Sequence, residues 1–453
     1  MQYRLPTIVL FLLLMVKVQA QQELGLHFVN DIWQASQTNP AMMNDHRLTI
    51  ALPGAAAGFY HSAFSLNDAL QTRGGTTYVN LDNAISKLDD NNQLLAGVQG
   101  DLIGAAYNFG DFQIGASWSV RGNAFVDYTR ESLDVLWNGN GGYVGETVNV
   151  AMIFQFTGYN EIGLSGAYNW QDKIAVGAKV KWLNGFSDLS TDRSDQELSL
   201  ETNEDVYQSS FLTNFVFRRA GFPPVTGASD LEAQVYNFNM TGGNTGFGFD
   251  VGITANVTDR LTLSASVIDL GSINWKNDTY EYTSHGKYNY NGLDLFSYSS
   301  ADTVDTQRLA DDLQIIADNI TGTLDIRNTT KQNYNYNTPL HTRGYFSGTY
   351  RLMEDLTVGG LFYLENTRLG MQPGFALSAR KPLGKWVTLG ATYGMRNGRF
   401  NNFGLNATGH LGPLQVYLAS DNVIGAVNPF GSRNTNLRLG FNVALWEIEP
   451  PLE

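Results

Sequence analysis

Apolar and polar residues alternate with a period of two in segments that recur along most of the chain. In each segment the apolar residues occupy one face, and small or charged residues occupy the other. Because successive side chains of a β-strand point to opposite faces of a sheet, this alternation predicts strands with one dry face and one polar face. The clearest segments are 161–170, 173–182, 247–256 and 437–445.

The length and composition of these segments favour a transmembrane β-barrel. The polar face is rich in Gly, Ser, Thr and Asn, as expected of a hydrated lumen. Each segment has about ten residues, which is enough for a tilted strand to cross a bilayer. A soluble exported sandwich is the alternative, because alternation alone fits both folds. Aromatic residues at or near the segment ends would form an interfacial girdle, namely Trp170, Trp182, Trp386 and Tyr393.

Short and longer connections alternate along the chain, as in outer-membrane barrels with tight periplasmic turns and extended outer loops. Long polar connections are expected at about 121–160, 184–246 and 271–340. Counting segments predicts an all-β, antiparallel, up-and-down barrel of about 14 strands between Leu48 and Trp446, closed so that every backbone group in the bilayer is bonded. Very short turns are expected at 110–111, 171–172, 257–260, 353–355, 382–385 and 412–413.

The chain divides into a signal, a short leading segment, the barrel and a tail. Residues 1–20 have a basic start, an apolar core and a small-x-small pattern at 18–20, so they predict a cleaved signal peptide and export. We expect an N-terminal periplasmic segment at 21–46, the barrel at 47–446 and a C-terminal periplasmic tail at 447–453. The expected location is the outer membrane of a Gram-negative bacterium, in contact with lipid and lipopolysaccharide.

Two stretches, 80–95 and 305–318, follow helical rather than strand spacing. Both fall in predicted outer loops. We expect short amphipathic helices that cover their own apolar residues, and the alternative is a plug that gates the barrel. The apolar positions are Leu81, Ile85 and Leu88 in the first stretch and Leu309, Leu313 and Ile316 in the second.

Composition and charge exclude several classes of protein. The 453 residues include no Cys, so the chain is neither a disulfide-stabilised scaffold nor a protein with a Cys-based zinc site. The net charge is −14, with 29 Lys and Arg against 43 Asp and Glu, so we expect no nucleic-acid partner. Beyond the N-terminus there is no uncharged apolar run of the roughly 18 residues that a membrane-spanning helix needs.

A search for catalytic and cofactor motifs finds nothing that would make the chain an enzyme. The six histidines are dispersed, without an H-E-x-x-H motif, and there is no G-x-S-x-G elbow or P-loop. The glycines of 246–250 lie in an alternating strand without a following helix, which favours packing over phosphate binding. Acidic residues between 188 and 205 could hold Ca²⁺, but their spacing does not match an EF-hand, and a solvated surface is the simpler interpretation. We expect no catalytic residue, no cofactor and no bound metal.

Charged residues on the polar face of the strands are the candidate functional residues. A water-filled pore that they line would bias the passage of ions. Alternatively, the charges pair across the lumen and keep a narrow barrel closed. The lumen-lining candidates are Lys179, Lys181, Asp250, Glu365, Arg380 and Arg438.

Three short motifs stand out beside this pattern. Asn39-Pro40-Ala41 precedes the first strand, 270–275 closes a strand after a tight turn, and 412–417 begins another strand. These motifs resemble segments of exported Bacteroidota barrels, the PorV/PorP-like and FadL-like families, and the chain is similar to an uncharacterised family among them.

By analogy with FadL-like transporters, this resemblance implies an outer-membrane barrel that passes or binds a small or hydrophobic solute. By analogy with PorV/PorP-like components of a secretion system, the alternative is a non-transporting barrel that acts as a structural or assembly partner of envelope or secretion machinery. The resemblance carries over no catalytic residue.

Overall fold

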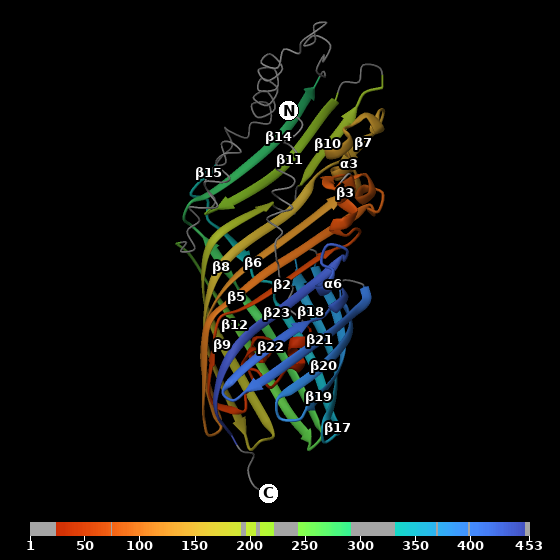
Figure 1. Cartoon of the computed structure of the whole chain (residues 1–453). Helices are drawn as coiled ribbons and strands as arrows, with labels where there is room; N and C mark the ends of the chain where they lie inside the picture. The colour runs from red at the N-terminus through yellow and green to blue at the C-terminus, as the bar shows by residue number, and fades with distance from the viewer. Residues whose placement is uncertain are drawn as a thin grey trace.

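The computed structural model forms one closed antiparallel β-barrel with a sheet that projects from one end (Figure 1). The predicted signal peptide, the helical stretch at 305–318 and the last five residues of the predicted tail lie outside the described residues. The structure describes residues 24–73, 75–191, 196–204, 209–221, 243–290, 331–367, 370–396 and 399–448.

The barrel has fourteen strands, as the sequence predicts. β1 (His46–Ala51) and β2 (Gly54–His61) together form the first strand, which is interrupted at Leu52 and Pro53. Both pieces pair with β5 on one side and with β23 on the other, so the barrel closes. The other strands are β5 (Asn91–Phe109), β6 (Phe112–Thr129), β8 (Met152–Trp170), β9 (Ile174–Thr191), β12 (Asn244–Thr258), β13 (Leu261–Trp275), β17 (Arg343–Met353), β18 (Leu356–Thr367), β19 (Gly370–Leu383), β20 (Val387–Arg396), β21 (Arg399–Leu411), β22 (Leu414–Ser420) and β23 (Asn434–Glu447).

The predicted short turns all join strands at the same end of the barrel, which we call the turn end. Gly110, Gly384 and Gly412 have φ angles of 63°, 69° and 61° in three of these turns, a left-handed conformation that glycine adopts without strain. Gln171 and Asp172 adopt similar angles between β8 and β9. The opposite end carries the long connections, and we call it the loop end.

Four strands continue well past the barrel at the loop end. β5, β6, β8 and β9 have 19, 18, 19 and 18 residues, nearly twice the roughly ten that a tilted strand needs to cross a bilayer. Much of the connection expected at 121–160 is therefore strand, because the alternating pattern continues beyond the barrel wall.

The connections expected at 184–246 and 271–340 also contain strands, which extend this projecting sheet. β11 pairs with both β9 and β14, and β16 pairs with the loop end of β13. The added strands are β7 (Thr147–Asn149), β10 (Glu197–Thr202), β11 (Ser209–Ala220), β14 (Thr279–Tyr290), β15 (Lys331–Gln332) and β16 (Tyr336–Pro339).

A small module between β2 and β5 packs against β6. Leu81, Ile85 and Leu88, the residues with helical spacing, are buried in its core beside Tyr128. The helix expected at 80–95 is thus one short helix that covers its own apolar residues, and it does not plug the barrel. The short elements at the loop end are η3 (Leu66–Ala69), β3 (Leu70–Arg73), β4 (Thr76–Val79), α2 (Asp82–Ile85), α3 (Arg130–Asn138), η4 (Gly141–Tyr143) and α6 (Val423–Val427).

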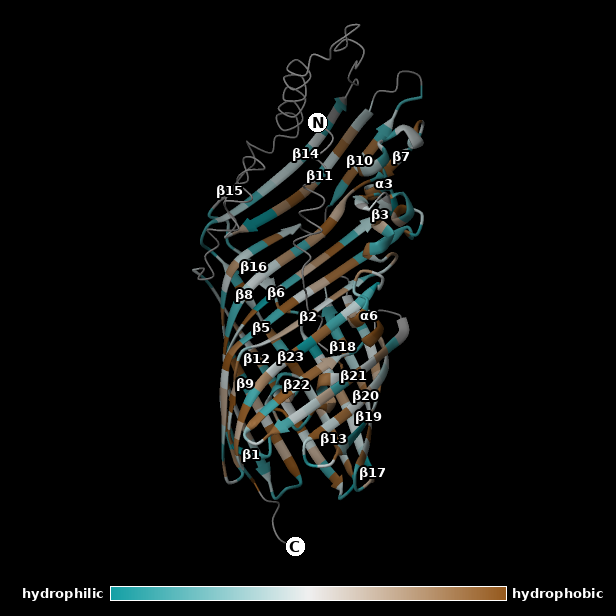
Figure 2. Ribbon diagram, in the orientation of Figure 1, coloured by the Kyte–Doolittle hydropathy of each residue, from teal (hydrophilic) through white to brown (hydrophobic). Residues whose placement is uncertain are grey.

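The outward face of the barrel is apolar along its strands. Figure 2 shows hydrophobic and hydrophilic residues interspersed along these strands. The four aromatic residues predicted for the girdle are all exposed on it. The inward face carries mainly Ser, Thr, Asn and charged residues, the reverse of a water-soluble sandwich. Exposed apolar side chains include Ile162, Leu164, Val180, Phe247, Phe346, Phe362 and Leu377. Among the described residues, no helix combines the length and apolar character that crossing a membrane requires.

Candidate functional site

The lumen of the barrel contains part of the chain itself. Residues 24–45, which we call the plug, include the 3₁₀-helices η1 (Gly25–Phe28) and η2 (Trp33–Gln37) and contact strands around the inside of the wall. They are the red segment inside the barrel in Figure 1. The sequence predicts an N-terminal periplasmic segment at 21–46, and the strand pattern gives no indication that this segment enters the lumen.

The apolar residues of the plug explain why it enters the lumen. Leu26, Val29 and Ile32 form a buried cluster with Tyr417 of β22. Trp33 covers Gly104 of β5 so closely that a Cβ on this glycine would lie 2.3 Å from the indole ring. Apolar surface of this size gains free energy when it leaves water. The spacing of three between apolar residues was a signal of this burial that the strand pattern obscured.

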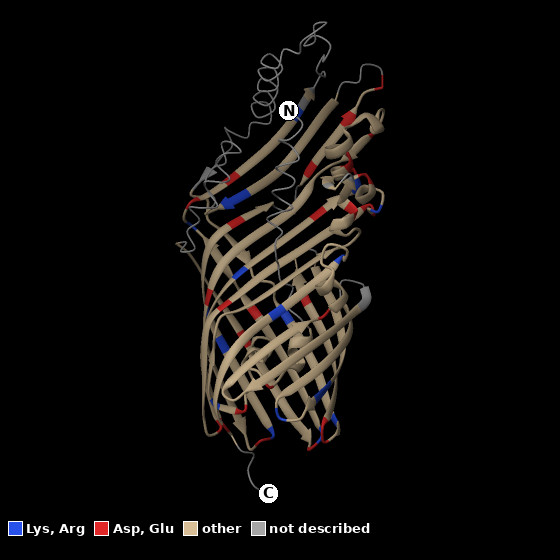
Figure 3. Cartoon of the chain, in the orientation of Figure 1, with Lys and Arg blue, Asp and Glu red and all other residues tan. Residues whose placement is uncertain are grey.

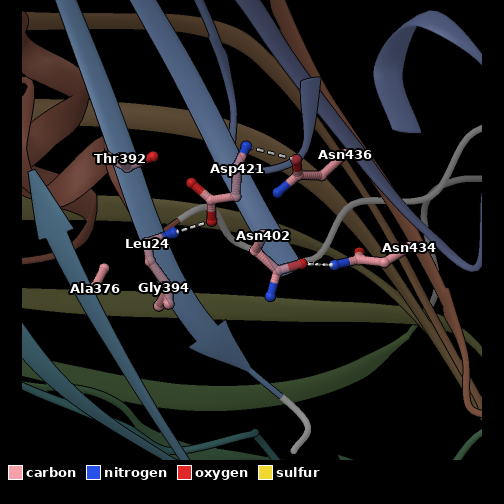
Figure 4. Close-up of a pocket in the computed structure, with 8 residues that line it drawn as sticks. All are labelled: Leu24, Ala376, Thr392, Gly394, Asn402, Asp421, Asn434 and Asn436. Atoms are coloured by element: carbon pink, nitrogen blue, oxygen red, sulfur yellow. Dashed lines mark hydrogen bonds between the residues drawn. The ribbon is translucent and has the colours of Figure 1, made fainter. Parts of the chain in front are cut away.

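Asp421 anchors the plug at the loop end (Figure 4). Its carboxylate accepts hydrogen bonds from the backbone N–H groups of Leu24, at 2.5 Å, and Gly25, at 2.8 Å. Asn436 holds Asp421 in turn by accepting a hydrogen bond from its backbone N–H at 2.8 Å. The cavity beside these residues measures about 20 Å³, enough for about one water molecule.

An ion pair fixes the plug near the turn end. Arg380 of β19 donates from Nη2 to Oδ1 of Asp31 at 2.7 Å and to the hydroxyl of Thr408 at 3.1 Å. Gln415 donates to the backbone carbonyl of Asp31 at 2.8 Å. Arg380, one of the lumen candidates from the sequence, therefore holds the plug in place.

The middle of the plug is bound by further polar side chains. Arg438 lies with Nη1 3.4 Å from Oδ2 of Asp101 and 3.3 Å from the amide oxygen of Gln37. His27 contacts the hydroxyls of Thr38 and Ser347 at 2.9 and 2.8 Å. Plug and wall thus share a continuous hydrogen-bonded layer.

The Asn39-Pro40-Ala41 motif lies where the plug approaches the wall most closely. A Cβ on Gly177 of β9 would lie 2.2 Å from the carbonyl oxygen of Pro40, and one on Gly252 of β12 would lie 1.9 Å from Oδ1 of Asn39. Asn39 also donates to the backbone carbonyl of Ile253 at 3.2 Å. The paired glycines make room for the motif.

Eight buried ionisable residues, which we call the charge network, lie beside this contact. Lys181 is at its centre, 2.7 Å from Asp250 and in contact with Asp269. Asp269 also accepts from Arg343 at 2.6 Å, and Arg343 reaches Glu365 at 3.1 Å. The network consists of Arg121, Glu161, Lys179, Lys181, Asp250, Asp269, Arg343 and Glu365.

The charges of the network are balanced. Glu161 completes it with ion pairs to Arg121 at 3.0 Å and Lys179 at 2.9 Å, giving four cations and four carboxylates. Buried charges persist in proteins when such partners compensate the loss of hydration. Figure 3 shows that charged residues are few in the middle of the wall. The arrangement matches the closed interpretation better than a pore lined by free charges.

An apolar cluster fills the lumen above the network, toward the loop end. Trp275 and Ile273 of β13 are fully buried there with Leu183 of β9. The Trp275 indole donates to the hydroxyl of Thr338 at 2.9 Å. Plug, charge network and apolar cluster thus all lie inside the barrel.

All six lumen candidates from the sequence have buried side chains on the inside of the barrel. Lys179, Lys181, Asp250 and Glu365 belong to the charge network, whereas Arg380 and Arg438 contact the plug. Sequence reasoning missed their partners, although Glu161 lies on the polar face of its segment. The missed residues are Asp31, Gln37, Asp101, Arg121, Glu161, Asp269 and Arg343.

The acidic residues considered for Ca²⁺ do not form a site in the part of the chain that the structure describes, where no cluster of His, Asp and Glu could hold a metal ion. Asp188 is not on a solvated surface as expected. It is fully buried and accepts hydrogen bonds from Thr157 at 2.7 Å and Tyr336 at 3.0 Å. Asp192, Asp195 and Asp205 lie outside the described residues.

The model of a family of unknown function, DUF5723, matches residues 40–421. Curated proteins contain no match to the sequence.

Several solved structures are similar at low identity. The toluene transporter TbuX of Ralstonia pickettii is 11% identical, with 92% of this chain and 94% of that chain covered and a TM-score of 0.44. A FadL homologue of Pseudomonas aeruginosa is 11% identical, covering 92% and 95%, with a TM-score of 0.46. The translocator domain of the autotransporter NalP from Neisseria meningitidis is 8% identical, covering 89% and 90%, with a TM-score of 0.33.

Proposed function

The chain belongs to the DUF5723 family of unknown function, and we propose that it is an outer-membrane barrel that passes a small solute through a lumen closed by its own plug. The observation that supports this proposal most is the polar character of the contacts between plug and wall. We propose the outer membrane of a Gram-negative bacterium as its location, surrounded by lipid and lipopolysaccharide.

The apolar outer wall supports the membrane location. A closed barrel satisfies its backbone hydrogen bonds within the sheet, as a bilayer requires. The exposed Trp170 ends β8 and the exposed Trp386 directly precedes β20, so both lie at the turn end of the wall, where membrane interfaces favour tryptophan.

The plug contacts support an opening step. Hydrogen bonds such as those of Gln34 and Asn39 with their partners can be exchanged for hydrogen bonds to water. The net loss is about 0.5–1.5 kcal/mol for each uncharged bond. Movement of the plug also exposes its apolar residues, such as those packed on Tyr417, so opening is rare, but it does not require the barrel strands to separate.

A disulfide between plug and wall tests the proposal. The chain has no Cys, so Asn39→Cys with Gly252→Cys introduces the only thiols. The Cγ atom of Asn39 lies 2.9 Å from the position of a Cβ on Gly252, close enough for the pair to be bridged. The measurement is single-channel conductance of the purified barrel in a planar bilayer, with an empty-detergent control.

We expect rare conductance steps from the wild type and more frequent steps from Asp421→Ala, which frees the loop end of the plug. The oxidised disulfide variant should be silent, and a reductant should restore its steps. Silence from all folded and inserted variants, with and without reductant, would contradict passage through the lumen.

The projecting sheet favours a second candidate function, a structural or assembly partner of envelope or secretion machinery. β10, β11 and β14 extend far beyond the barrel and would offer a protein surface outside the membrane. Under this alternative the paired charges and the plug stabilise a permanently filled barrel. Silence in the conductance experiment, together with a protein that co-purifies with the barrel and is lost when β11 and β14 are shortened, would favour it.

A further inference from the structure

A second, larger cavity lies between the plug and the wall near the turn end. It measures about 220 Å³ and is lined by the plug on one side and by β17 to β20 on the other. Asn30 of the plug and Pro382 of β19 are exposed at its rim, so it opens toward the turn end. Pockets for drug-sized ligands measure roughly 300–1,000 Å³, so the occupant of this cavity is smaller than they are.

Residues that carry hydroxyl groups contribute to the wall of this cavity, beside apolar surface. Four neighbouring strands each contribute one, from Thr349, Thr357, Ser378 and Thr388. Phe28 of the plug adds one aromatic ring and packs on Gly359. A lining of this kind suits a molecule with several hydroxyls and a small apolar face.

Three lining residues each hold a buried polar atom that makes no hydrogen bond within the described residues. These atoms are Oδ2 of Asp31, Nε of Arg380 and Oγ of Ser378. A buried polar atom without a partner costs about 1–3 kcal/mol. The set includes an acceptor, a donor and a hydroxyl. Each atom has almost no accessible surface, so a ligand hydroxyl, which both donates and accepts, would reach it after a small shift of the lining side chains.

The charge of the cavity points to a neutral ligand. Asp31 and Arg380 are the charged residues of the lining, and they already pair with each other at 2.7 Å. A free anion would meet the carboxylate of Asp31, and a free cation would meet the guanidinium of Arg380. Neither sign of charge is favoured.

From this geometry we infer that the cavity between the plug and strands β17–β20 binds a small, neutral, polyhydroxylated molecule of monosaccharide size. The inference deepens the proposed function and rests on it, because it names the class of solute that reaches the plug from the turn end. On this inference, a solute that enters from the turn end first meets the ion pair of Asp31 and Arg380, which anchors the plug.

Binding is tested with the full-length barrel in an amine-oxide detergent, which carries no sugar headgroup. The probe is D-glucose, observed by saturation-transfer difference NMR, with acetate and toluene as probes of the anionic and apolar classes. The variants are Ser378→Ala and Thr349→Val, which remove one hydroxyl each. Ser119→Ala, a buried inward serine on β6 outside the cavity, is the matched control.

We expect glucose to bind to the wild type and to Ser119→Ala equally. Each cavity variant should weaken binding by about threefold to tenfold, the equivalent of one uncharged hydrogen bond. Absence of a glucose signal, a signal that both cavity variants leave unchanged, or tighter binding of acetate or toluene at this cavity would overturn the inference.

Binding of glucose does not depend on an open lumen, so the binding experiment and the conductance experiment can give independent results. If reduction opens the disulfide variant but glucose does not bind, the inference is wrong and the proposed passage stands. If glucose binds to a barrel that never conducts, the cavity is a binding site and the proposed passage is wrong.

Discussion

The ammonium group of Lys181 lies between the carboxylates of Asp250 and Asp269, and its side chain is only 1% exposed. Desolvating a charge at such a position is costly, and the two carboxylates compensate for it. Removing one member of a buried ion pair leaves an uncompensated charge and typically costs about 3–5 kcal/mol. The charge network therefore stabilises the barrel only as long as it is complete.

Lys181→Met is expected to lower the free energy of unfolding by about 3–5 kcal/mol, measured by urea unfolding in phospholipid vesicles. The control is Lys381→Met, which breaks an exposed pair with Asp355 and should change stability by less than about 1 kcal/mol. Equal effects of the two substitutions would show that the network does not contribute as argued. Adding Asp250→Asn to Lys181→Met should restore part of the loss, because it removes a carboxylate left without its cation.

Alternation predicts at this scale which charges point inward, because the side-chain period of a strand is two. It does not predict their partners. Lys181 and Asp269 are 88 residues apart, and Arg121 and Glu161 are 40 apart. The predicted up-and-down order indicates which strands are neighbours, but it does not give the register at which two inward side chains meet.

The module between β2 and β5 shows how one element is held together by short-range contacts. Asp68 accepts hydrogen bonds from the backbone and the hydroxyl of Ser65, at 2.8 and 2.9 Å, and from Lys87 at 2.5 Å. Burial alone would raise the pKa of Asp68, but these hydrogen bonds outweigh it and hold the pKa below its usual value. The contacts thus favour the carboxylate form.

Because the pKa of Asp68 is lower in the folded state, its contribution to stability is present above the ordinary Asp value of about 4 and is lost as the pH falls through the folded pKa. Lys87→Met should raise this pKa toward the ordinary value. A ¹³C NMR titration of the Asp68 carboxyl group measures both midpoints. The same midpoint in wild type and variant would contradict a role for Lys87.

The plug is the element that the strand pattern did not predict. Its two 3₁₀-helices have four and five residues, so their apolar spacing of three does not extend into a longer pattern. Its apolar residues find their partners on β5, β13, β17, β18, β19 and β22, which are distant in sequence. The plug that we considered at 80–95 lies instead in the outer module, since its apolar residues have a nearer surface on β6.

At the scale of the whole molecule, the apolar wall and the projecting sheet require different surroundings. Leu377 is 57% exposed on β19 of the barrel, and Leu212 is 43% exposed on β11 of the projecting sheet. In the proposed outer membrane the first side chain meets lipid and the second meets water. The same substitution at the two positions therefore distinguishes the two environments.

Leu377→Arg should destabilise the barrel by about 2–4 kcal/mol, because arginine is costly on the lipid face of a barrel wall. Leu212→Arg is the matched control and should have little effect. Urea unfolding of both variants in phospholipid vesicles measures the difference. If the two variants were equally stable, the proposed position of the bilayer around the barrel would be wrong.

The sequence by itself determined the closed fourteen-stranded barrel, its short turns and the inward direction of the six candidate charges. These features follow from local properties, namely a side-chain period of two and the residues that turns accept. The tertiary structure alone decided which charges pair, that residues 24–45 fill the lumen, and where a cavity remains. Those features depend on contacts between segments far apart in the chain, which exist only once the barrel has closed around its N-terminal segment.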